Sequence, residues 1–326
     1  MKRKGNFYHL IYNRANLLLA HNKAKKGKLH YSEVKYVEEN LDFCLLKLQT
    51  MLKDETYSLN LTDYTYEVIN DKGKERELYK LSYYPHRIIQ WAIINVISNT
   101  FYSNFIYDTY ASIKGKGIHS LVKKLKRVLV KDIKGTSYCL KIDIKKYYNN
   151  INNKILYRKL ERKFKDKRFL KLMKIIIFSR GDKGQPIGSL LSQYLANFYL
   201  SSFDHYCKEI LKLKYYFRYM DDIVILHESK EYLHQIKRQF DLILTKYFDL
   251  EIKSNWQVFL VDSRGVDYVG YRFFRYKTLL RRRIYLKARY CFSRPYKHKA
   301  RISYYGWCKH ANIPKFMKKY KLTGGD

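Results

Sequence analysis

The four residues Tyr219-Met220-Asp221-Asp222 carry the clearest chemistry in this sequence. Apolar, β-branched and aromatic residues flank them on both sides, which predicts a β-hairpin with two adjacent carboxylates at its tip. Two like charges beside buried strands are costly unless a cation offsets them, and Mg²⁺ is readily bound by carboxylate oxygens. The alternative is a solvated turn, where aspartate is also common.

The composition favours a polyanionic partner. The 326 residues include 66 Lys and Arg against 29 Asp and Glu, a formal net charge of +37. Such an excess destabilises a compact chain by self-repulsion, which a bound nucleic acid would relieve. Aromatic residues make up 17% of the chain and supply stacking surface for bases. A Lys- and Tyr-rich composition inherited from an AT-rich genome is the alternative, but it does not explain the imbalance of sign.

The cysteines and the apolar runs indicate in which cellular compartment the protein is expected. Its five cysteines lie far apart and form no CxxC pair, so neither a disulfide framework nor a zinc site is expected. No apolar run approaches the ~18 residues of a membrane span, and the basic start is not followed by a signal sequence. We therefore expect a cytoplasmic protein with no membrane contact.

Hydrophobic periodicity divides the first part of the chain into helices and one hairpin. The hairpin joins 64–69 to 77–81 through a glycine-bearing turn, and its returning arm carries Lys74 and Arg76. A basic loop over Lys114–His119 could offer charge and backbone N–H groups to phosphate, although a lysine-rich connector has the same pattern. Helices are expected over 6–24, over 32–54 with Ser32 as N-cap, over 87–97 and over 118–131.

A second acidic position, Asp143, ends an expected buried strand over 138–144. A lone Asp at a strand end is usually a cap or turn former. The elements that follow, however, predict a β-α-β-β-α-β sheet with Asp143 and Asp221 on neighbouring strands. They are helices near 153–164 and 168–178, a loop over 180–188, a helix from Ser189 to about Leu211, the Asp-Asp hairpin, a helix over 230–247, a strand over Leu250–Lys253 and a hairpin over Val258–Phe274.

Three carboxylates on two neighbouring strands meet the needs of two-metal phosphoryl transfer. One ion would activate an attacking hydroxyl, and the other would hold the leaving pyrophosphate. A core-edge acid paired with a lysine would account for Asp143 alone. It fits poorly with Asp221 and Asp222 together.

Together these motifs resemble those of reverse transcriptases, specifically the diversity-generating retroelement type. Tyr219-Met220-Asp221-Asp222 is similar to the YxDD motif, and Lys141–Ile151 to the strand with the other metal-binding aspartate. The type is indicated by Ile187–Gln193, with an aliphatic residue before Gly and Gln after Ser, where most reverse transcriptases have Gln-Gly and Ser-Pro. Further similar segments are Lys74–Gln90 (fingers), Tyr110–His119 (basic loop), Val266–Tyr271 (primer grip) and Tyr304–Asn312 near the end.

The resemblance implies an α+β fold of the right-hand polymerase type, with fingers, a ferredoxin-like palm and a small helical thumb. The expected boundaries are an N-terminal helical extension over 1–60, fingers over 61–135, a palm over 136–274 with a fingers insertion at about 150–185, and a thumb over 275–326.

The resemblance also implies roles for individual residues. Asp143, Asp221 and Asp222 would be catalytic and, together with Ile144, would hold two Mg²⁺ ions, for which Mn²⁺ can substitute. Lys253 is the one candidate for a general acid, with a poor register. Tyr148 would exclude a 2′-hydroxyl, in a nucleotide-binding set of Lys74, Arg76, Tyr148, Gln185, Ile187 and Gly188. Template and primer contacts are expected from Lys114, Lys116, Tyr219, Met220, Gly270, Tyr271, Arg281, Arg282 and Arg283.

The implied activity is that of an RNA-directed DNA polymerase copying a template-repeat RNA into cDNA, with errors at template adenines, to diversify a target gene by mutagenic retrohoming. Implied partners are template RNA, cDNA or DNA, dNTPs and a small basic, oligomeric accessory variability protein, in a bacterial or phage setting. Group II intron-like, CRISPR-associated and phage-defence reverse transcriptases are alternatives. A non-catalytic RNA-binding protein on a polymerase scaffold is a more distant one, because binding alone needs none of the three aspartates.

Overall fold

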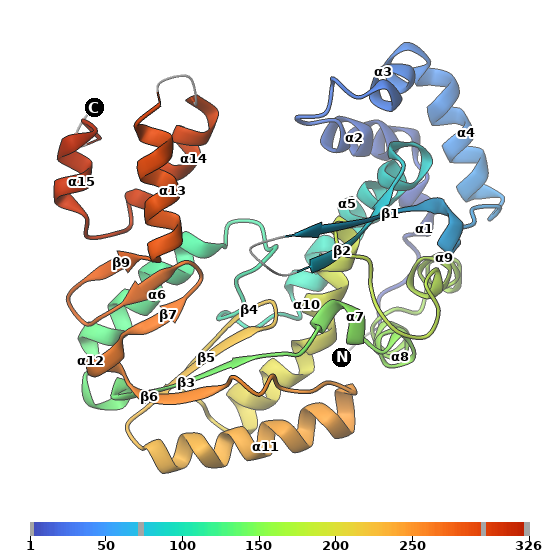
Figure 1. The fold of residues 1–326 in the computed structure, drawn as a ribbon. Coiled ribbons are helices and arrows are strands. Elements are labelled where there is room, and N and C mark those ends of the chain that lie inside the picture. Colours follow the sequence, from blue (N-terminus) through green and yellow to red (C-terminus); the bar gives the residue numbers. More distant parts are fainter. Residues whose placement is uncertain (1–2, 71–74, 295–297, 323–326) are drawn as a thin grey trace. The chain divides into compact units, whose positions relative to one another are not determined.

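The computed structural model describes residues 3–70, 75–294 and 298–322, and its contacts divide the chain into two compact units (Figure 1). The first unit comprises Met1–Ile106, Lys145–Asp204 and Leu244–Glu251, and the second comprises Tyr107–Ile144, His205–Ile243 and Ile252–Asp326. Each unit is therefore assembled from segments that are distant in the sequence. No helix among the described residues is long and apolar enough to cross a membrane.

The first unit combines helices with a two-stranded antiparallel sheet. Strands β1 and β2 pair from Tyr64 opposite Leu81 to Asn70 opposite Glu75, which is the hairpin expected from the alternating pattern. The elements of this unit are α1 (Tyr8–Ile11), α2 (Arg14–Ala24), α3 (Ser32–Glu39), α4 (Leu41–Lys53), η1 (Leu61–Asp63), β1 (Tyr64–Asn70), β2 (Glu75–Leu81), η2 (Tyr83–Arg87), α5 (Ile88–Tyr102), α7 (Tyr147–Asn150), α8 (Asn153–Lys163), α9 (Lys167–Phe178) and α10 (Leu190–His205).

The expected N-terminal helices are broken where the sequence predicted continuity. Asn13 accepts a hydrogen bond from the Ala15 N–H, so a new helix starts after a short first one. Asn40 has φ −118° and ψ 37°, which separates α3 from α4. Ser32 is the first residue of α3, and no side chain caps that helix. The apolar stripe nevertheless stays buried across the break, which is why periodicity alone missed it.

The second unit is built on a four-stranded antiparallel sheet with the order β4-β5-β3-β6. Along the chain, helices separate β3 from β4 and β5 from β6, in agreement with the β-α-β-β-α-β series expected from the sequence. The elements of this unit are α6 (Ile118–Lys131), η3 (Lys134–Thr136), β3 (Tyr138–Asp143), η4 (Tyr206–Ile210), β4 (Tyr215–Tyr219), β5 (Asp222–His227), α11 (Lys230–Phe248, ending in the first unit), β6 (Gln257–Leu260), α12 (Val261–Arg264), β7 (Val266–Tyr268), β8 (Tyr271–Phe273), β9 (Thr278–Leu280), α13 (Arg282–Phe292), α14 (His298–Cys308) and α15 (Pro314–Lys319).

Two predicted elements near residue 250 are wrong. Leu250–Lys253 forms no strand, although Ile252 makes an isolated bridge to Ile144, and the fourth strand is β6 instead. The hairpin expected over Val258–Phe274 is therefore shorter and consists of β7 and β8. The first residues of the expected hairpin, Val258 to Leu260, instead belong to β6, which pairs with the edge of β3.

One apolar core joins α6 to a face of the four-stranded sheet. The buried residues of α6 recur at helical spacing and pack with Cys139, Phe217 and Val224, while Phe292 and Phe316 from the C-terminal helices join the same cluster. The α6 residues in this core are Leu121, Val122, Leu125, Val128 and Leu129.

We expect Leu125→Ala to lower the free energy of unfolding by about 2–5 kcal/mol, because Leu125 is fully buried and its truncation leaves a cavity. Val130→Ala on the same helix is the matched control. Val130 is largely exposed, so its truncation should change stability by no more than about 0.5 kcal/mol. Urea titration of both variants measures the difference, and equal effects would contradict the assigned core.

Candidate active site

The sheet of the second unit places the predicted carboxylates at one end. Asp143, the last residue of β3, lies opposite Asp222, the first residue of β5. Tyr219 pairs with Asp222, so Met220 and Asp221 form the turn between β4 and β5. Met220 takes a left-handed φ of 55°, which is uncommon for a side chain of this kind and tightens the turn.

Backbone hydrogen bonds fix Asp221 against the continuation of β3. The Ile144 N–H donates to the Asp221 carbonyl oxygen at 3.2 Å. Side chains alternate between the two faces of a strand, so Asp143 and Asp222 share one face with Lys141. The structure thus brings Asp143, Asp221 and Asp222 to the same end of the sheet, with Ile144 between them.

Burial and nearby negative charge disfavour the ionised forms of Asp221 and Asp222. Burial, reinforced by Asp143, raises the pKa of Asp221 to about 6. Burial also raises the pKa of Asp222, although Lys141 opposes that shift. The Asp222 Oδ1 atom is buried without a hydrogen-bond partner among the described residues. Such an oxygen is unfavourable unless a cation or a proton donor reaches it.

Lys253 supplies a cation to one of the three carboxylates. Its ammonium forms an ion pair with Asp143, and its backbone N–H donates to the Asp143 carbonyl oxygen at 2.9 Å. The register expected for Lys253 from the sequence was poor, and the structure shows that it follows an isolated bridge between Ile252 and Ile144 and lies in no strand. In the described part of the chain, no three His, Cys, Asp or Glu side chains converge closely enough to hold a metal ion as they stand.

A second layer of contacts supports the carboxylate end of the sheet. The Tyr268 hydroxyl donates to the Asp222 carbonyl oxygen at 2.9 Å, and burial raises its pKa well above the usual range. Lys141 Nζ donates to the Asp267 carbonyl oxygen at 2.7 Å, and the Asp267 carboxylate pairs with Arg281. These contacts connect β7 and the start of α13 to the strands that carry the aspartates.

The residues predicted to contact template and primer in the second unit fall into two groups. Gly270 has φ +90°, and an added Cβ would lie 2.5 Å from Trp307, so the position requires glycine. Tyr271 is buried and donates to the Trp307 carbonyl oxygen at 3.0 Å. In contrast, Tyr219 and Met220 are partly exposed, and Arg282 and Arg283 are exposed at the start of α13.

The two lysines of the expected basic loop, Lys114 and Lys116, also differ in their exposure. Lys116 Nζ donates to the Tyr107 carbonyl oxygen at 2.6 Å and lies 4.3 Å from the centroid of that ring. Burial lowers the pKa of Lys116. Lys114 is exposed to solvent. Lys116 therefore shapes the loop, and Lys114 is the side chain that is presented outward.

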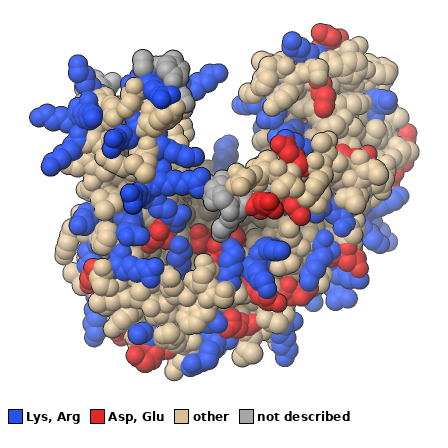
Figure 2. Space-filling model, in the orientation of Figure 1, with Lys and Arg blue, Asp and Glu red and all other residues tan. Residues whose placement is uncertain are grey.

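Basic side chains crowd the surface formed by the C-terminal helices of the second unit (Figure 2). Mixed among them are partly exposed tyrosines such as Tyr290 and Tyr305. A surface of this kind suits phosphate contacts combined with stacking. Its exposed cations include Arg282, Arg283, Lys287, Arg289, Lys315, Lys318 and Lys319.

The remaining predicted site residues lie in the first unit. The Tyr148 carbonyl oxygen accepts the Gln185 N–H at 2.8 Å, which joins α7 to the loop before α10. Gln185 is buried, and its amide donates to Asn153 Oδ1 at 2.7 Å. Ile187 is partly buried, and its carbonyl oxygen accepts the Tyr79 N–H at 3.3 Å. Gly188 is exposed with φ +108°.

In the sequence, Lys74 and Arg76, the two predicted triphosphate contacts, belong to the β1–β2 hairpin region. Lys74 lies outside the described residues. Arg76 lies in β2 opposite Ile69.

Sequence reasoning missed Arg180, which begins the loop before α10. Its guanidinium lies 3.5 Å from the centroid of the Tyr79 ring, and Nη1 is buried without a hydrogen-bond partner among the described residues. In the sequence, the position of Arg180 directly before a glycine-bearing loop could have suggested a functional cation. Only the structure shows that the Tyr79 ring of β2 contacts its guanidinium.

The raised pKa of Asp221 predicts how stability depends on pH in buffer free of divalent ions. A carboxyl group with a higher pKa in the folded than in the unfolded state stabilises the fold below about 3.8, and this contribution disappears as the pH rises to about 6. Relative to wild type, Asp221→Asn should therefore gain about 1–3 kcal/mol across that range. Urea titrations at several pH values measure the difference. A constant difference would contradict the raised pKa, and Asp54→Asn, at an exposed position, is the control.

Comparisons with known proteins place this geometry in a family. Residues 69–273 match the family described as reverse transcriptase (RNA-dependent DNA polymerase). Protein YkfC of Escherichia coli (strain K12) is 23% identical over 134 residues, covering 38% of this chain and 35% of that protein. The chain thus spans about a third of the length of this curated relative.

Solved telomerase structures resemble the fold. One from Candida albicans, in complex with a fragment of telomeric RNA, has a TM-score of 0.50 at 11% identity and covers 70% of this chain and 47% of that one. Another, from Candida tropicalis with a fragment of telomeric RNA, has a TM-score of 0.48 at 14% identity, over 70% and 46% of the two chains. At such identities the likeness concerns the fold alone. Because the family match spans more than half of its residues, the chain belongs to the reverse transcriptase family.

Proposed function

We propose that this chain is an RNA-directed DNA polymerase. The observation that carries the proposal is the register of Asp143 opposite Asp222 on neighbouring strands, with Asp221 in the adjoining turn. Membership of the reverse transcriptase family and the net charge of +37 support nucleic acid as substrate. In this proposal the four-stranded sheet is the palm, β1 and β2 belong to the fingers, and the C-terminal helices form the thumb, with the boundaries expected from the sequence.

Two Mg²⁺ ions, with Mn²⁺ as a substitute, are the proposed cofactors, since reverse transcriptases generally use divalent metal ions. The donor set supports them, because carboxylate oxygens suit a hard cation and Asp222 Oδ1 is buried without a hydrogen-bond partner among the described residues. Bound ions would activate the primer hydroxyl and offset the charge of the leaving pyrophosphate. Asp143, Asp221 and Asp222 would hold them, beside Ile144, once Lys253 leaves the Asp143 carboxylate.

The proposed nucleotide contacts come from the first unit. Tyr148 would exclude the 2′-hydroxyl by the bulk of its ring, and the hydrogen bond from Gln185 links its backbone to the loop of Ile187 and Gly188. Since the Gln185 amide donates to Asn153, we assign Gln185 to shaping this loop. Lys74 and Arg76 remain predictions for the triphosphate.

Template and primer would bind along exposed cations and aromatic side chains of the second unit. Arg282, Arg283 and Lys114 are exposed and suited to phosphate, whereas Arg281 is partly buried and would first have to leave Asp267. Tyr219 and Met220 are suited to the primer end, which must lie beside the aspartates. Gly270 and Tyr271 would position these elements from within the core. Template RNA, cDNA and dNTPs are the corresponding partners.

The finer proposal is a diversity-generating retroelement enzyme that copies a template-repeat RNA with errors at adenines. Ile187–Gln193 supports this type, because an isoleucine precedes Gly188 where most reverse transcriptases have glutamine. An accessory protein that is itself basic would not bind so positive a chain by simple charge attraction. Shared RNA or apolar contact would have to hold the two together.

Asp143→Asn and Asp221→Asn test the polymerase proposal. Each should reduce dNTP incorporation on a primed RNA template by at least about a hundredfold, since each removes a charge that the metal ions need. RNA affinity, which depends on the distributed basic surface, should change little. Asp54→Asn should keep wild-type activity, and near wild-type rates in either test variant would refute the metal assignment.

Tyr148→Ala should admit ribonucleotides, because the bulk of the ring and not a hydrogen bond excludes the 2′-hydroxyl. We expect the preference for dNTPs over rNTPs to fall by at least about tenfold in Tyr148→Ala and to persist in Tyr148→Phe, which retains the ring. Single-nucleotide incorporation assays measure both ratios. An unchanged ratio in Tyr148→Ala would mean that another residue selects the sugar.

Ile187→Gln should lower misincorporation by up to about tenfold. The glutamine amide can donate and accept one hydrogen bond near the nucleotide, worth about 0.5–1.5 kcal/mol, whereas isoleucine can do neither. Sequencing cDNA made by wild type, Ile187→Gln and the apolar control Ile187→Leu measures the effect. Frequent substitutions at template adenines are expected in wild type. Uniformly low error there would contradict the diversity-generating type but not the polymerase proposal.

A further inference from the structure

Arg218 is a charged side chain in the core of the second unit. It belongs to β4 and is fully buried, and the strand residues before it, Tyr216 and Phe217, are buried as well. A buried guanidinium costs free energy unless hydrogen bonds offset its lost hydration. An apolar residue would fill this position at lower cost, so the charged group requires a specific reason to be there.

The Arg218 guanidinium reaches the turn that carries Asp221. Its Nη1 atom donates to the Met220 carbonyl oxygen at 3.0 Å. Met220 is the first residue of this two-residue turn and has φ 55°, a conformation that glycine adopts freely and other residues adopt rarely. The hydrogen bond therefore stabilises a backbone conformation that the methionine itself disfavours.

Three successive carbonyl oxygens, those of residues 220–222, accept hydrogen bonds from different parts of the second unit. In that order, the donors are the Arg218 guanidinium, the Ile144 N–H at 3.2 Å and the Tyr268 hydroxyl at 2.9 Å. Asp221 is the middle residue of this segment. Its backbone is therefore held on both sides as well as at its own carbonyl group, and Arg218 supplies the first of these three contacts.

The backbone of Arg218 is itself fixed on both edges of β4. On one edge Arg218 pairs with Ile223 of β5. On the other edge, its N–H donates to the Asp108 carbonyl oxygen at 3.0 Å, and its carbonyl oxygen accepts the Tyr110 N–H at 3.1 Å. Asp108 is buried, and the Tyr110 hydroxyl donates to its Oδ1 atom at 3.0 Å. The guanidinium thus extends toward the turn from a rigid base.

We propose that Arg218 is a positioning residue for Asp221, because its hydrogen bond to Met220 holds the turn in the left-handed conformation that places the Asp221 carboxylate for catalysis. Arg218 acts on the backbone of the turn and does not itself touch the reacting groups. The inference rests on the proposed function, since the exact placement of a carboxylate matters for a rate only where the carboxylate takes part in the reaction.

Hydrogen–deuterium exchange of the full-length chain, in buffer free of divalent ions, tests the effect on the turn. The Ile144 N–H reports contact with the turn, and the Leu140 N–H in the middle of β3 reports the sheet as a whole. We expect Arg218→Lys and Arg218→Gln, which both lack the planar guanidinium, to accelerate exchange at Ile144 at least about tenfold and at Leu140 much less. Adding Met220→Gly should restore most of the Ile144 protection, because glycine adopts the φ of the turn without strain.

Arg275→Lys is the matched control. Arg275 lies in the same unit, is buried, and donates to the Leu129 carbonyl oxygen at 2.9 Å and to Thr136 Oγ1 at 2.8 Å. Thr136 precedes the start of β3, whereas Asp143 ends that strand. Arg275→Lys therefore removes a buried guanidinium at the other end of β3, and it should leave exchange at Ile144 relative to Leu140 unchanged.

Single-turnover dNTP incorporation gives the second measurement. Both Arg218 variants should lower the rate at saturating dNTP at least about tenfold, while the half-saturating dNTP concentration should change less than about threefold. This split is expected because the turn places a reacting carboxylate and does not bind the nucleotide. Arg275→Lys should retain the wild-type rate.

Each outcome decides for or against the proposal. Exchange at Ile144 that stays at the wild-type rate, or that rises equally at Leu140, in both Arg218 variants would overturn it, as would wild-type incorporation rates or failure of both variants to fold. Fast exchange that persists after Met220→Gly is added would overturn it too, because the conformation of the turn would not be the cause. A wild-type chain that incorporates no dNTP would contradict the polymerase function, and the exchange rates would still decide whether Arg218 holds the turn.

Discussion

The strand register of the second unit brings carboxylates together, and the packing of the sheet must hold them against their mutual repulsion. Asp143 and Asp222 are directly opposite each other on neighbouring strands, and like charges in that relation are destabilising. Asp221 adds a third carboxylate in the adjoining turn. A one-residue slip of β5 would relieve the conflict, but residues 223–226 are buried on both faces of the sheet, and each would leave the neighbours it now packs against. The close packing of this apolar run therefore holds the acidic cluster in place.

The same pattern explains why the sequence predicted this region well. Runs of buried residues before Asp143 and on both sides of Asp221 define strands, and their pairing follows from the short turn at Met220. The α6 boundaries also agree with the expected 118–131, since its apolar residues recur at helical spacing. The chemistry of the site then follows from which strand ends carry carboxylates. Here local pattern and tertiary fold agree.

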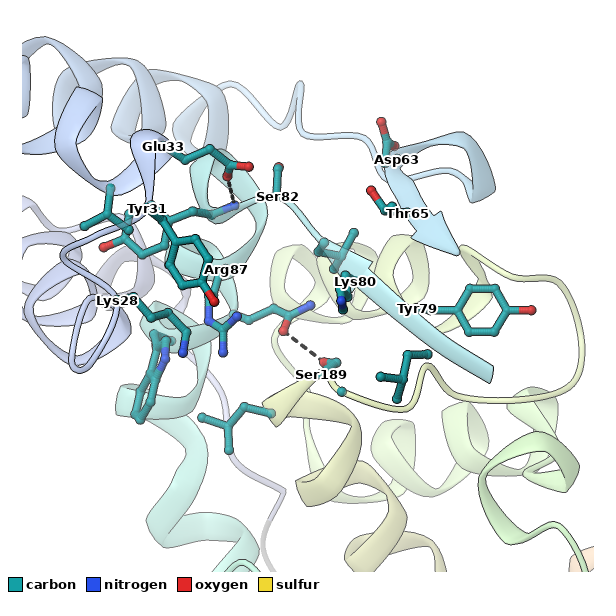
Figure 3. Close-up of a pocket in the computed structure, with 18 of the residues that line it drawn as sticks. Lys28, Tyr31, Glu33, Asp63, Thr65, Tyr79, Lys80, Ser82, Arg87 and Ser189 are labelled. Atoms are coloured by element: carbon teal, nitrogen blue, oxygen red, sulfur yellow. Dashed lines mark hydrogen bonds between the residues drawn. The ribbon is translucent and has the colours of Figure 1, made fainter. Parts of the chain in front are cut away.

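Prediction failed where a long-range contact overrides local preference. Asn40 ends α3 and precedes α4, although the apolar residues on both sides of it follow the spacing of one continuous helix. Tertiary packing keeps the apolar residues of both helices buried. Leu250–Lys253 has the apolar character of a strand, yet the edge of β3 is taken by β6. The buried amide of Gln185 and the stacking of Arg180 on Tyr79 depend on residues far away in sequence. A cavity beside β2 (Figure 3) was likewise not predicted, because its walls come from five separate segments of the chain.

The nearby cations offset the negative charges of Asp143, Asp221 and Asp222 to different extents. This difference affects which of the three carboxylates would gain most from a bound cation. Asp143 has a direct partner in Lys253, whereas Lys141 and then Arg281 act on Asp222 through space. Asp221 receives only the opposing influence of Lys253 and a backbone hydrogen bond, and its pKa is raised to about 6. A divalent cation would therefore relieve Asp221 most and would compete with Lys253 for Asp143. Because the Lys253 ammonium already pairs with the Asp143 carboxylate, a metal ion bound there would replace one favourable contact with another.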